Sequence, residues 1–327
     1  MKKNKVSLRE LSENSGVTSA FLTAVSKARV RTKFYRQFSI SKRDSSKRTI
    51  SSPLPNLSVF QQWVLENVLN EDKYISKYAK AYRTNYSIKQ NVKFHRQQDI
   101  VLKLDIEDFF GNIKNKDLFL IFKKMGYSND TAGILANLCS LGKKGVPQGA
   151  PTSPVLSNLV LANFDEWCGK TFYNNFALRY TRYADDITLS GSFQNISPRQ
   201  AIAKISQKLF SYGFSLNMNK IKVQRKGHRQ IITGITVNDV VNVNTKYRKN
   251  LRLEIHHYLS DHRDVHLRKK FPKNTINEEL MLYYTDSLIG KINYILYINP
   301  KNKGYFEQQK TILKQLRQKY TERTQDI

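Results

Sequence analysis

Hydrophobic and polar positions along the 327-residue chain change period several times, and each period predicts a different element. Residues 7–30 predict two short helices separated by a turn at Ser15-Gly16, and residues 57–69 carry apolar side chains at helical spacing. Residues 36–52 instead alternate polar and apolar around Asp44-Ser45-Ser46, which predicts a basic hairpin. The first part of the chain therefore combines helices with a strand pair.

The middle of the chain predicts a sheet with helices around it. Residues 101–106 predict a strand ending in an acidic turn, and residues 177–190 predict two strands around a tight turn at Ala184-Asp185-Asp186. Residues 222–243 are again strand-like. Helices are expected at 116–124, at 130–140, behind Ser153-Pro154 as far as Trp167, and at 199–212. This mixed order favours an α+β fold over a doubly wound parallel sheet.

The pattern divides the chain into three segments. Residues 1–35 form an N-terminal helical segment, residues 36–245 hold the predicted sheet, and residues 246–327 are helical and strongly basic. The spacing from Leu8 to Val25 is one that a helix-turn-helix could use. A packing module is the favoured interpretation, because such spacing is common by chance.

Charge indicates the kind of partner. Lys and Arg number 55 against 26 Asp and Glu, which gives a net charge of +29 spread along the chain. A nucleic acid is the default partner of such a surface, because phosphate contacts release counterions. The alternative is a protein that is merely basic. The 40% of hydrophobic residues, with 17 Phe and 18 Tyr, suffices for a core.

The cysteines and the apolar runs indicate where in the cell the protein is expected, more than which reaction it catalyses. Cys139 and Cys168 lie far apart without zinc-site spacing, so reduced core thiols are expected. No apolar run is long enough to span a bilayer, and no secretion signal follows the basic N-terminus. We expect no membrane association and a cytoplasmic location.

Two acidic turns carry the candidate chemistry. Asp185 and Asp186 lie between apolar strands, and Asp105 ends another strand. Three carboxylates that face one another suit two magnesium ions, which prefer oxygen ligands and support the attack of a hydroxyl on a phosphate. Glu107 and Asp108 follow Asp105 and are as readily interpreted as turn residues. An isolated Asp-Asp pair would be weak evidence, but this pair has apolar strands on both sides.

These residues resemble the motifs of reverse transcriptases. Tyr183-Ala184-Asp185-Asp186 matches the signature box of that family, and Asp105 matches its first catalytic carboxylate. Phe110 falls where the family has an aromatic gate against the ribose 2′-hydroxyl, and residues 146–154 match its Pro-Gln-Gly loop. Gly213-Phe214 through Lys220 resembles the motif whose Lys donates a proton to pyrophosphate, and Lys47 to Ile50 the fingers segment that holds the triphosphate.

The resemblance implies a right-hand polymerase with fingers, a palm made of an antiparallel sheet with helices, and a short helical thumb. It implies two Mg²⁺ ions, with Mn²⁺ as a possible substitute, and deoxynucleoside triphosphates as substrates. The implied metal ligands are Asp105, Asp185 and Asp186, joined in catalysis by Lys220, and the implied nucleotide-binding residues are Arg48, Ile106, Phe110, Gln148 and Gly149. Lys220 and Arg48 have the alternative interpretation of solvated surface charges.

A narrower resemblance is to retron reverse transcriptases. Asn91-Val92-Lys93-Phe94-His95 resembles their Asn-Ala-x-x-His segment, and Ile232-Thr233-Gly234 their Val-Thr-Gly motif, each with one aliphatic exchange. This resemblance implies RNA binding by Asn91, His95, Thr233, Gly234, Lys246, Arg248 and Arg252. His95 could instead be an ordinary helix-end histidine, and Thr233-Gly234 a strand bulge.

The retron resemblance also implies a biological setting. The partners would be a cognate structured noncoding RNA, its DNA product and an effector protein within an anti-phage defence system. Two alternatives stay open: a group II intron-like or other bacterial reverse transcriptase, and a non-catalytic RNA-binding scaffold that kept the fold.

Overall fold

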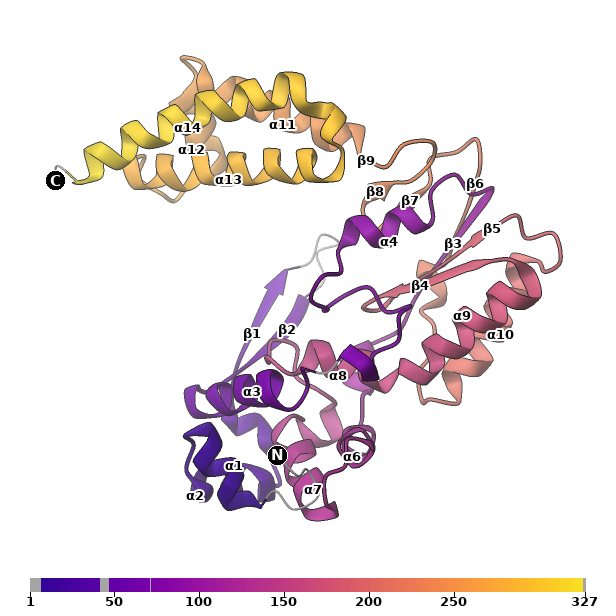
Figure 1. Ribbon diagram of the computed structural model, residues 1–327. Coiled ribbons are helices and arrows are strands. Elements are labelled where there is room, and N and C mark those ends of the chain that lie inside the picture. Colours follow the sequence, from indigo (N-terminus) through magenta and orange to yellow (C-terminus); the bar gives the residue numbers. More distant parts are fainter. Residues whose placement is uncertain (1–6, 42–46, 71, 326–327) are drawn as a thin grey trace. The chain divides into compact units, whose positions relative to one another are not determined.

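The computed structural model describes residues 7–41, 47–70 and 72–325. The chain divides into two compact units, one ending at Gln224 and one beginning at Arg225 (Figure 1). The sequence predicted a domain boundary near residue 245. The two units instead divide earlier in the chain, because the three short strands that precede residue 245 belong to the second unit. The predicted hairpin turn at Asp44–Ser46 lies outside the described residues.

The first unit alternates helices and strands as the pattern predicts. Its helices are α1 (Leu8–Ser15), α2 (Ser19–Lys27), α3 (Pro55–Asn67), α4 (Ile88–Phe94), α5 (Phe109–Asn112), α6 (Asn115–Lys124), α7 (Asn129–Leu138), α8 (Ser153–Val160), α9 (Ala162–Phe176) and α10 (Pro198–Phe210). Its strands are β1 (Tyr35–Ser41), β2 (Lys47–Pro53), β3 (Ile100–Asp105), β4 (Arg179–Tyr183), β5 (Asp186–Gly191) and β6 (Lys222–Arg225), of which the last residue is the first of the second unit. Short 3₁₀ turns occur at Arg31–Phe34, Asp72–Tyr74, Gly142–Lys144 and Met218–Lys220.

A four-stranded sheet forms the centre of this unit, in the order β4-β5-β3-β6. β5 pairs antiparallel with both β3 and β4. The apolar residues of β3, such as Leu102 and Leu104, are buried, and α9 packs against β4. These apolar strands therefore lie inside the unit, as their hydrophobic runs predict, and the helices around the sheet complete an α+β fold.

The helix expected behind Ser153-Pro154 is interrupted. It ends at Val160, and a second helix begins at Ala162, because Leu161 leaves helical geometry and its amide bonds to the carbonyl of Leu159 instead. Thr152, one residue earlier than expected, is the N-cap residue. The apolar periodicity continues across the break, so periodicity alone could not reveal it.

The N-terminal helices are part of the first unit. Leu11, Leu22 and Val25 are fully or almost fully buried in its core. α1 packs against α3, and α2 packs against α7. The apolar side chains of these helices are therefore used for packing, in agreement with the favoured interpretation.

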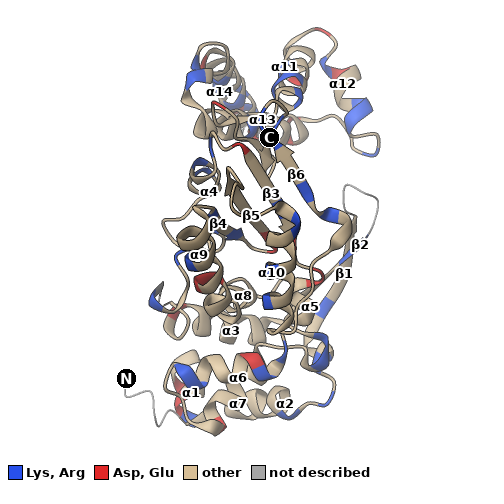
Figure 2. Cartoon of the chain, turned by 90° about the vertical axis from the view of Figure 1, so that its right-hand side faces the viewer, with Lys and Arg blue, Asp and Glu red and all other residues tan. Residues whose placement is uncertain are grey.

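The second unit combines a small sheet with a helical bundle. Its strands are β7 (Ile231–Ile232), β8 (Ile235–Thr236) and β9 (Asn242–Val243), and its helices are α11 (Thr245–Leu259), α12 (Arg263–Lys270), α13 (Glu278–Ile298) and α14 (Lys303–Gln325), with a 3₁₀ turn at Pro300–Asn302. The bundle has a core of its own, which includes Tyr258, Tyr284 and Leu288. In Figure 2, Lys and Arg are spread over α11, α12 and α14, among uncharged residues and some Asp and Glu.

The Asn91–His95 segment faces the interior of the first unit. His95 is fully buried between two strands: its Nδ1 lies 2.7 Å from the Ser190 hydroxyl and its Nε2 lies 2.7 Å from the Thr181 hydroxyl. Thr181 in turn donates to the Asn91 side-chain oxygen at 2.6 Å. The structure thus corrects the expectation of RNA contacts by Asn91 and His95, because both side chains are held inside and fasten α4 to the sheet.

Within the described part of the chain, no helix combines the length and the apolarity that crossing a membrane requires.

Burial makes His95 a source of pH-dependent stability. Loss of hydration, the largest effect, lowers its pKa from 6.5 to about 3. The unfolded chain therefore binds a proton near pH 6.5 that the folded chain does not, so stability falls as the pH drops from about 6.5 toward 3.

We expect His95→Gln to cost about 1–3 kcal/mol of unfolding free energy at pH 7.5, because buried hydroxyls lose their partner. Below pH 6.5 the gap between wild type and variant should shrink by up to about 1.4 kcal/mol per pH unit. Urea unfolding between pH 7.5 and 4.5 measures this gap, with exposed His228→Gln as the control. A gap independent of pH would contradict a neutral buried His95.

Candidate active site

The acidic turn between β4 and β5 is built by strand register. Tyr183 pairs with Asp186, so only Ala184 and Asp185 remain in the loop. Ala184 adopts a φ of 58°, the left-handed conformation that tight hairpins require. In the neighbouring ladder Asp105, the last residue of β3, lies directly opposite Asp186. Pairing thus brings Asp105 together with two carboxylates that lie far from it in the sequence.

Backbone hydrogen bonds continue this alignment past the end of β3. The amide of Ile106 donates to the carbonyl of Asp185 at 3.0 Å, and the amide of Asn217 donates to the carbonyl of Asp105 at 2.8 Å. Ile106 also forms a bridge with Leu216. The segment that leads to Lys220 is thereby fixed beside the acidic turn.

A buried ion pair holds the acidic turn in place. Arg182 and Asp165 are both fully buried, and their side chains form two hydrogen bonds of 2.9 and 2.6 Å. Arg182 also donates to the carbonyl of Ala184 at 2.9 Å, and the Tyr180 hydroxyl donates to Asp165 at 2.7 Å. Because the guanidinium reaches both α9 and the turn, it fixes the position of Asp185 and Asp186 relative to the helix.

A pocket of about 590 Å³ opens in front of the turn. It collects residues from β2, the segment after β3, the Gln148 loop and the acidic turn. Its lining comprises Lys47, Arg48, Thr49, Tyr82, Asp105, Ile106, Asp108, Phe109, Phe110, Gln148, Asp185, Asn217 and Lys220. Most of the residues predicted for metal and nucleotide binding thus share one cavity.

Cations and carboxylates are already paired in this region. The Lys220 Nζ lies 2.8 Å from Asp105 Oδ1, and the Lys103 Nζ lies 3.8 Å from Asp186 Oδ1. The hydrogen bond to Asp105 raises the pKa of Lys220. Burial, followed by neighbouring carboxylates, raises the pKa values of Asp185 and Asp186. The site therefore favours a bound cation, because added positive charge would relieve this repulsion.

The carboxylates fit a metal site without forming a closed one. Among residues 7–41, 47–70 and 72–325, no three His, Cys, Asp or Glu side chains are gathered as a ready metal-binding group. Asp105 and Asp185 reach the pocket, whereas Asp186 is absent from the described lining and faces Lys103. Oxygen donors and a lysine ammonium at Asp105 match the chemistry of a divalent cation, which would replace the ammonium.

The Gln148-Gly149 loop lies against β2. The carbonyl of Gln148 accepts a hydrogen bond of 2.7 Å from the amide of Ser51. Gly149 has a φ of 118°, and a side-chain carbon there would lie 2.8 Å from Ile50 Cγ2. A glycine is required at this close approach. The loop and β2, the strand that carries Arg48, therefore form one surface of the pocket. Gln148 lines the pocket, and Gly149 lies at the contact between the loop and β2.

The other expected RNA-binding residues lie in the second unit. Thr233 and Gly234 both have positive φ values, 46° and 84°, and form a two-residue turn between β7 and β8, so they are not a strand bulge. Lys246 and Arg252 are exposed on α11, and Arg252 stacks over the Tyr305 ring at 4.9 Å. Arg248 is half-buried and donates to Asn302 at 3.3 Å.

Sequence reasoning missed Tyr82 and Arg182. Tyr82 precedes β3 in a segment without an expected element, and Arg182 was interpreted only as part of a strand. No sequence pattern around Tyr82 indicated a functional role. An arginine inside an apolar strand next to an acidic turn was a signal for Arg182, because buried arginines require a partner.

Fold and site together define an α+β polymerase whose acidic turn lines a polar pocket, together with Lys47, Arg48 and Lys220. The chain belongs to the reverse transcriptase family: the family model described as "Reverse transcriptase (RNA-dependent DNA polymerase)" matches residues 40–250.

Curated relatives place the chain among retron-type reverse transcriptases. It is 32% identical to the retron Mx162 reverse transcriptase of Myxococcus xanthus over 230 residues, which is 62% of this chain and only 47% of that longer protein. It is 31% identical to the retron Ec86 reverse transcriptase of Escherichia coli over 231 residues, 68% of this chain and 69% of that protein. The retron Ec73 reverse transcriptase of Escherichia coli is 26% identical over 296 residues, 85% and 89% of the two chains.

Among solved structures, the fold is similar to that of telomerase from Candida albicans, determined in complex with a fragment of telomeric RNA. The TM-score is 0.51 at 13% sequence identity, over 86% of this chain and 63% of the telomerase chain. At this identity the similarity concerns the fold alone.

We expect Asp165→Asn to lower the unfolding free energy by about 3–5 kcal/mol, because it leaves the buried Arg182 charge without its partner. Glu13→Gln is the matched control: it breaks the exposed Arg9–Glu13 pair, which solvent screens, so stability should barely change. Chemical denaturation of both variants at pH 7.5 measures the difference. Equal, small losses for the two variants would show that the buried pair contributes little.

Proposed function

We propose that this chain is an RNA-directed DNA polymerase that copies a structured noncoding RNA into DNA. The observation that carries the proposal is the single pocket shared by Asp105, Asp185, Phe110, Gln148 and Arg48. Carboxylates for metal ions, a basic wall for a triphosphate and an aromatic ring beside them are the groups that nucleotidyl transfer requires.

Each group of the pocket has a defined role in this proposal. Asp105, Asp185 and Asp186 would hold two Mg²⁺ ions, which, when bound, activate the attacking hydroxyl and offset charge on the triphosphate. Arg48 holds the triphosphate through its guanidinium. Lys220, whose ammonium contacts Asp105 in this structure, would release that carboxylate and donate a proton to the pyrophosphate leaving group.

The other residues of the pocket are proposed to select the sugar and the base of the nucleotide. Phe110 is partly buried and lines the pocket, while Phe109 is almost fully buried against Phe214. Phe110 is therefore the ring that excludes a 2′-hydroxyl by contact. Ile106, Gln148 and Gly149 shape the floor on which the nucleotide and the template base rest, Gly149 by allowing the loop to approach β2.

The retron relatives support a narrower version of the proposal. The matched proteins are named retron reverse transcriptases, and similarity to Ec73 extends over most of both chains. We propose that the chain copies its own noncoding RNA into the branched RNA–DNA product of a retron. In this proposal it acts in the cytoplasm, together with an effector protein of an anti-phage defence system.

The second unit is the proposed RNA-recognition surface. Lys246 and Arg252 are exposed on α11, where they can meet phosphates. Thr233 is a β-branched residue in the left-handed conformation, and its buried hydroxyl finds no hydrogen-bond partner among the described residues. Such strain is retained where a site needs it. The turn at Thr233-Gly234 therefore supports a contact with RNA.

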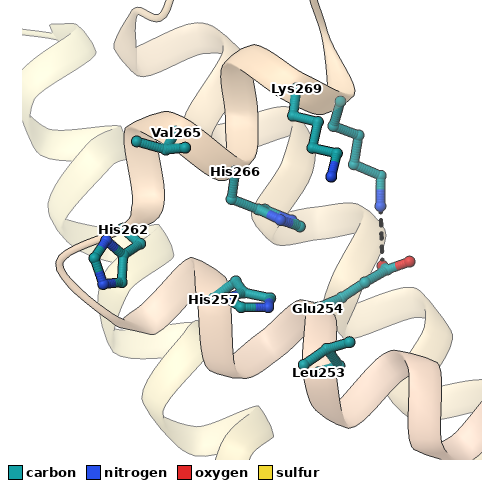
Figure 3. A pocket seen from close by; sticks show the side chains of 8 residues that line it. Leu253, Glu254, His257, His262, Val265, His266 and Lys269 are labelled. Carbon is teal, nitrogen blue, oxygen red and sulfur yellow. Dashed lines mark ion pairs between the residues drawn. The ribbon is translucent and has the colours of Figure 1, made fainter.

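A pocket of about 580 Å³ between α11 and α12 adds an aromatic and basic feature to this surface (Figure 3). Its lining is Leu253, Glu254, His257, His262, Val265, His266, Lys269 and Lys270. The rings of His257 and His266 stack at 5.7 Å, and Glu254 is paired with Lys270 at 3.1 Å. Stacked histidine rings beside the adjacent Lys269 and Lys270 suit an unpaired RNA base and its phosphate.

The polymerase function is tested by Asp185→Asn. We expect primer extension on an RNA template to be lost, since a missing metal ligand costs several kcal/mol of barrier. RNA affinity should stay within about twofold, because binding rests on distributed basic residues. Asp99→Asn, one residue before β3, is the matched control and should extend normally. Extension by Asp185→Asn above a tenth of the wild-type rate would remove this carboxylate from catalysis.

RNA recognition by the second unit is tested in the full chain by replacing Lys246 and Arg252 with Gln. Each lost phosphate contact should weaken binding by roughly 1 kcal/mol or less and lower the salt slope by about one. The control replaces Lys116 and Lys124, two exposed lysines of α6, so that it removes the same charge. Binding of copurifying RNA and of a shuffled sequence is measured at two salt concentrations. Equal losses in both double variants would show that only total charge matters.

A further inference from the structure

Tyr82 has a backbone conformation that large side chains rarely adopt. Its φ is 58°, in the left-handed region that normally favours glycine or asparagine. A bulky residue in this region carries strain, which persists only where the surrounding structure imposes it. At Tyr82, contacts made by the neighbouring residues hold this conformation in place.

The residues before Tyr82 are fastened to the centre of the unit. Ala79 bridges to Arg182, the amide of Lys80 donates to the carbonyl of Arg182 at 2.8 Å, and Ala81 accepts a hydrogen bond of 2.8 Å from the buried Asn158 side chain. This anchoring ties the segment to the same strand that precedes the acidic turn.

The residue after Tyr82 is fastened as well. The guanidinium of Arg83 donates to the carbonyls of Ser76 and Ala79 at 3.0 and 3.3 Å and stacks on the Tyr86 ring at 3.9 Å. Because the chain is held on both sides, the backbone at Tyr82 has little freedom to relax. The fold imposes the strained conformation and directs the Tyr82 side chain into the pocket.

Packing does not account for the strain. Tyr82 is 44% exposed and is not among the described residues that form the hydrophobic core. Its ring instead lines the pocket together with Asp105, Asp185, Phe110 and Gln148. Burial, then the nearby Asp185 carboxylate, raises the pKa of the Tyr82 hydroxyl, in agreement with a place beside the acidic turn.

The other groups that line the pocket indicate which part of the substrate the Tyr82 ring would contact. Lys47 and Arg48 provide positive charge on the β2 side, where a triphosphate would lie. Phe110 is the ring proposed to meet the sugar. An exposed aromatic face that carries no charge is suited to stack on a nucleobase, because every base has a π face.

We propose that Tyr82 is a positioning residue that stacks on the base of the incoming deoxynucleoside triphosphate and keeps its α-phosphate in line with the acidic turn. The proposal rests on the proposed polymerase function and extends it to a residue outside the recognised motifs. In this proposal the strain at Tyr82 is retained because this backbone conformation directs a large ring from the anchored segment into the pocket.

Tyr82→Gly separates a positioning role from a structural one. Glycine accepts a positive φ without strain, so the melting temperature should stay equal or rise. Loss of stacking should raise the KM for dNTPs roughly tenfold, in keeping with the usual strength of stacking between a base and an aromatic ring. Tyr82→Phe keeps the ring and should retain a KM close to wild type.

Matched controls come from the same unit and the same pocket. Tyr173→Ala removes an exposed tyrosine of α9 that neither lines the pocket nor takes part in the anchoring of Tyr82, and should leave the KM unchanged. Phe110→Val should alter the preference between dNTPs and rNTPs, whereas Tyr82→Gly should raise the KM for both alike. This difference separates a contact with the base from a contact with the sugar.

Direct binding of a dNTP, measured by equilibrium dialysis with Mg²⁺ and a primed RNA template, accompanies the kinetics. A Tyr82→Gly protein that is less stable than wild type and binds dNTPs as tightly would overturn the proposal and make Tyr82 structural. If the wild type binds dNTPs but does not extend the primer, the polymerase function fails, while the binding comparison still decides the role of Tyr82.

Discussion

The guanidinium of Arg182 is the group on which the arrangement of the first unit depends. It is buried with Asp165 of α9, it supports the carbonyl of Ala184 in the acidic turn, and the backbone of the same residue holds the segment that leads to Tyr82. A charge inside a protein is tolerated only with such partners, and it is costly to displace once they are present. One residue thus couples a helix, a hairpin and one wall of the pocket, so that none of the three can shift alone.

Electrostatics at the site follow from this rigidity. Strand pairing places Asp105 directly opposite Asp186, with Asp185 in the adjoining turn, and carboxylates so close together repel one another. Lys220 and Lys103 offset part of that repulsion from outside the turn. The turn is therefore shaped before any metal or nucleotide arrives, and a substrate meets a site whose reorganisation consists mainly of moving flexible lysine side chains.

Local patterns were sufficient for part of this structure. Apolar strands around Asp185-Asp186 predicted the hairpin, because that signal lies within a few residues. The resemblance to reverse transcriptase motifs implied a common site for Asp105 and Phe110, and both line the pocket. Arg182 and His95 could not be placed that way, since their burial depends on partners that are distant in the sequence. The break at Leu161 was invisible because apolar residues continue across it. Roles at Thr233-Gly234 and on α11 stay proposals.

The strand order β4-β5-β3-β6 has a consequence for synthesis of the chain on the ribosome. β3 is made early, but the strand that gives Asp105 its neighbour Asp186 follows much later, and the segment of Asn217 and Lys220 follows later still. Contacts between such distant residues form slowly, whereas the local helical contacts of the second unit form fast. The acidic centre is therefore among the last features of the first unit to assemble, and until then β3 is an unpaired apolar strand in the nascent polypeptide, open to misfolding or chaperone capture.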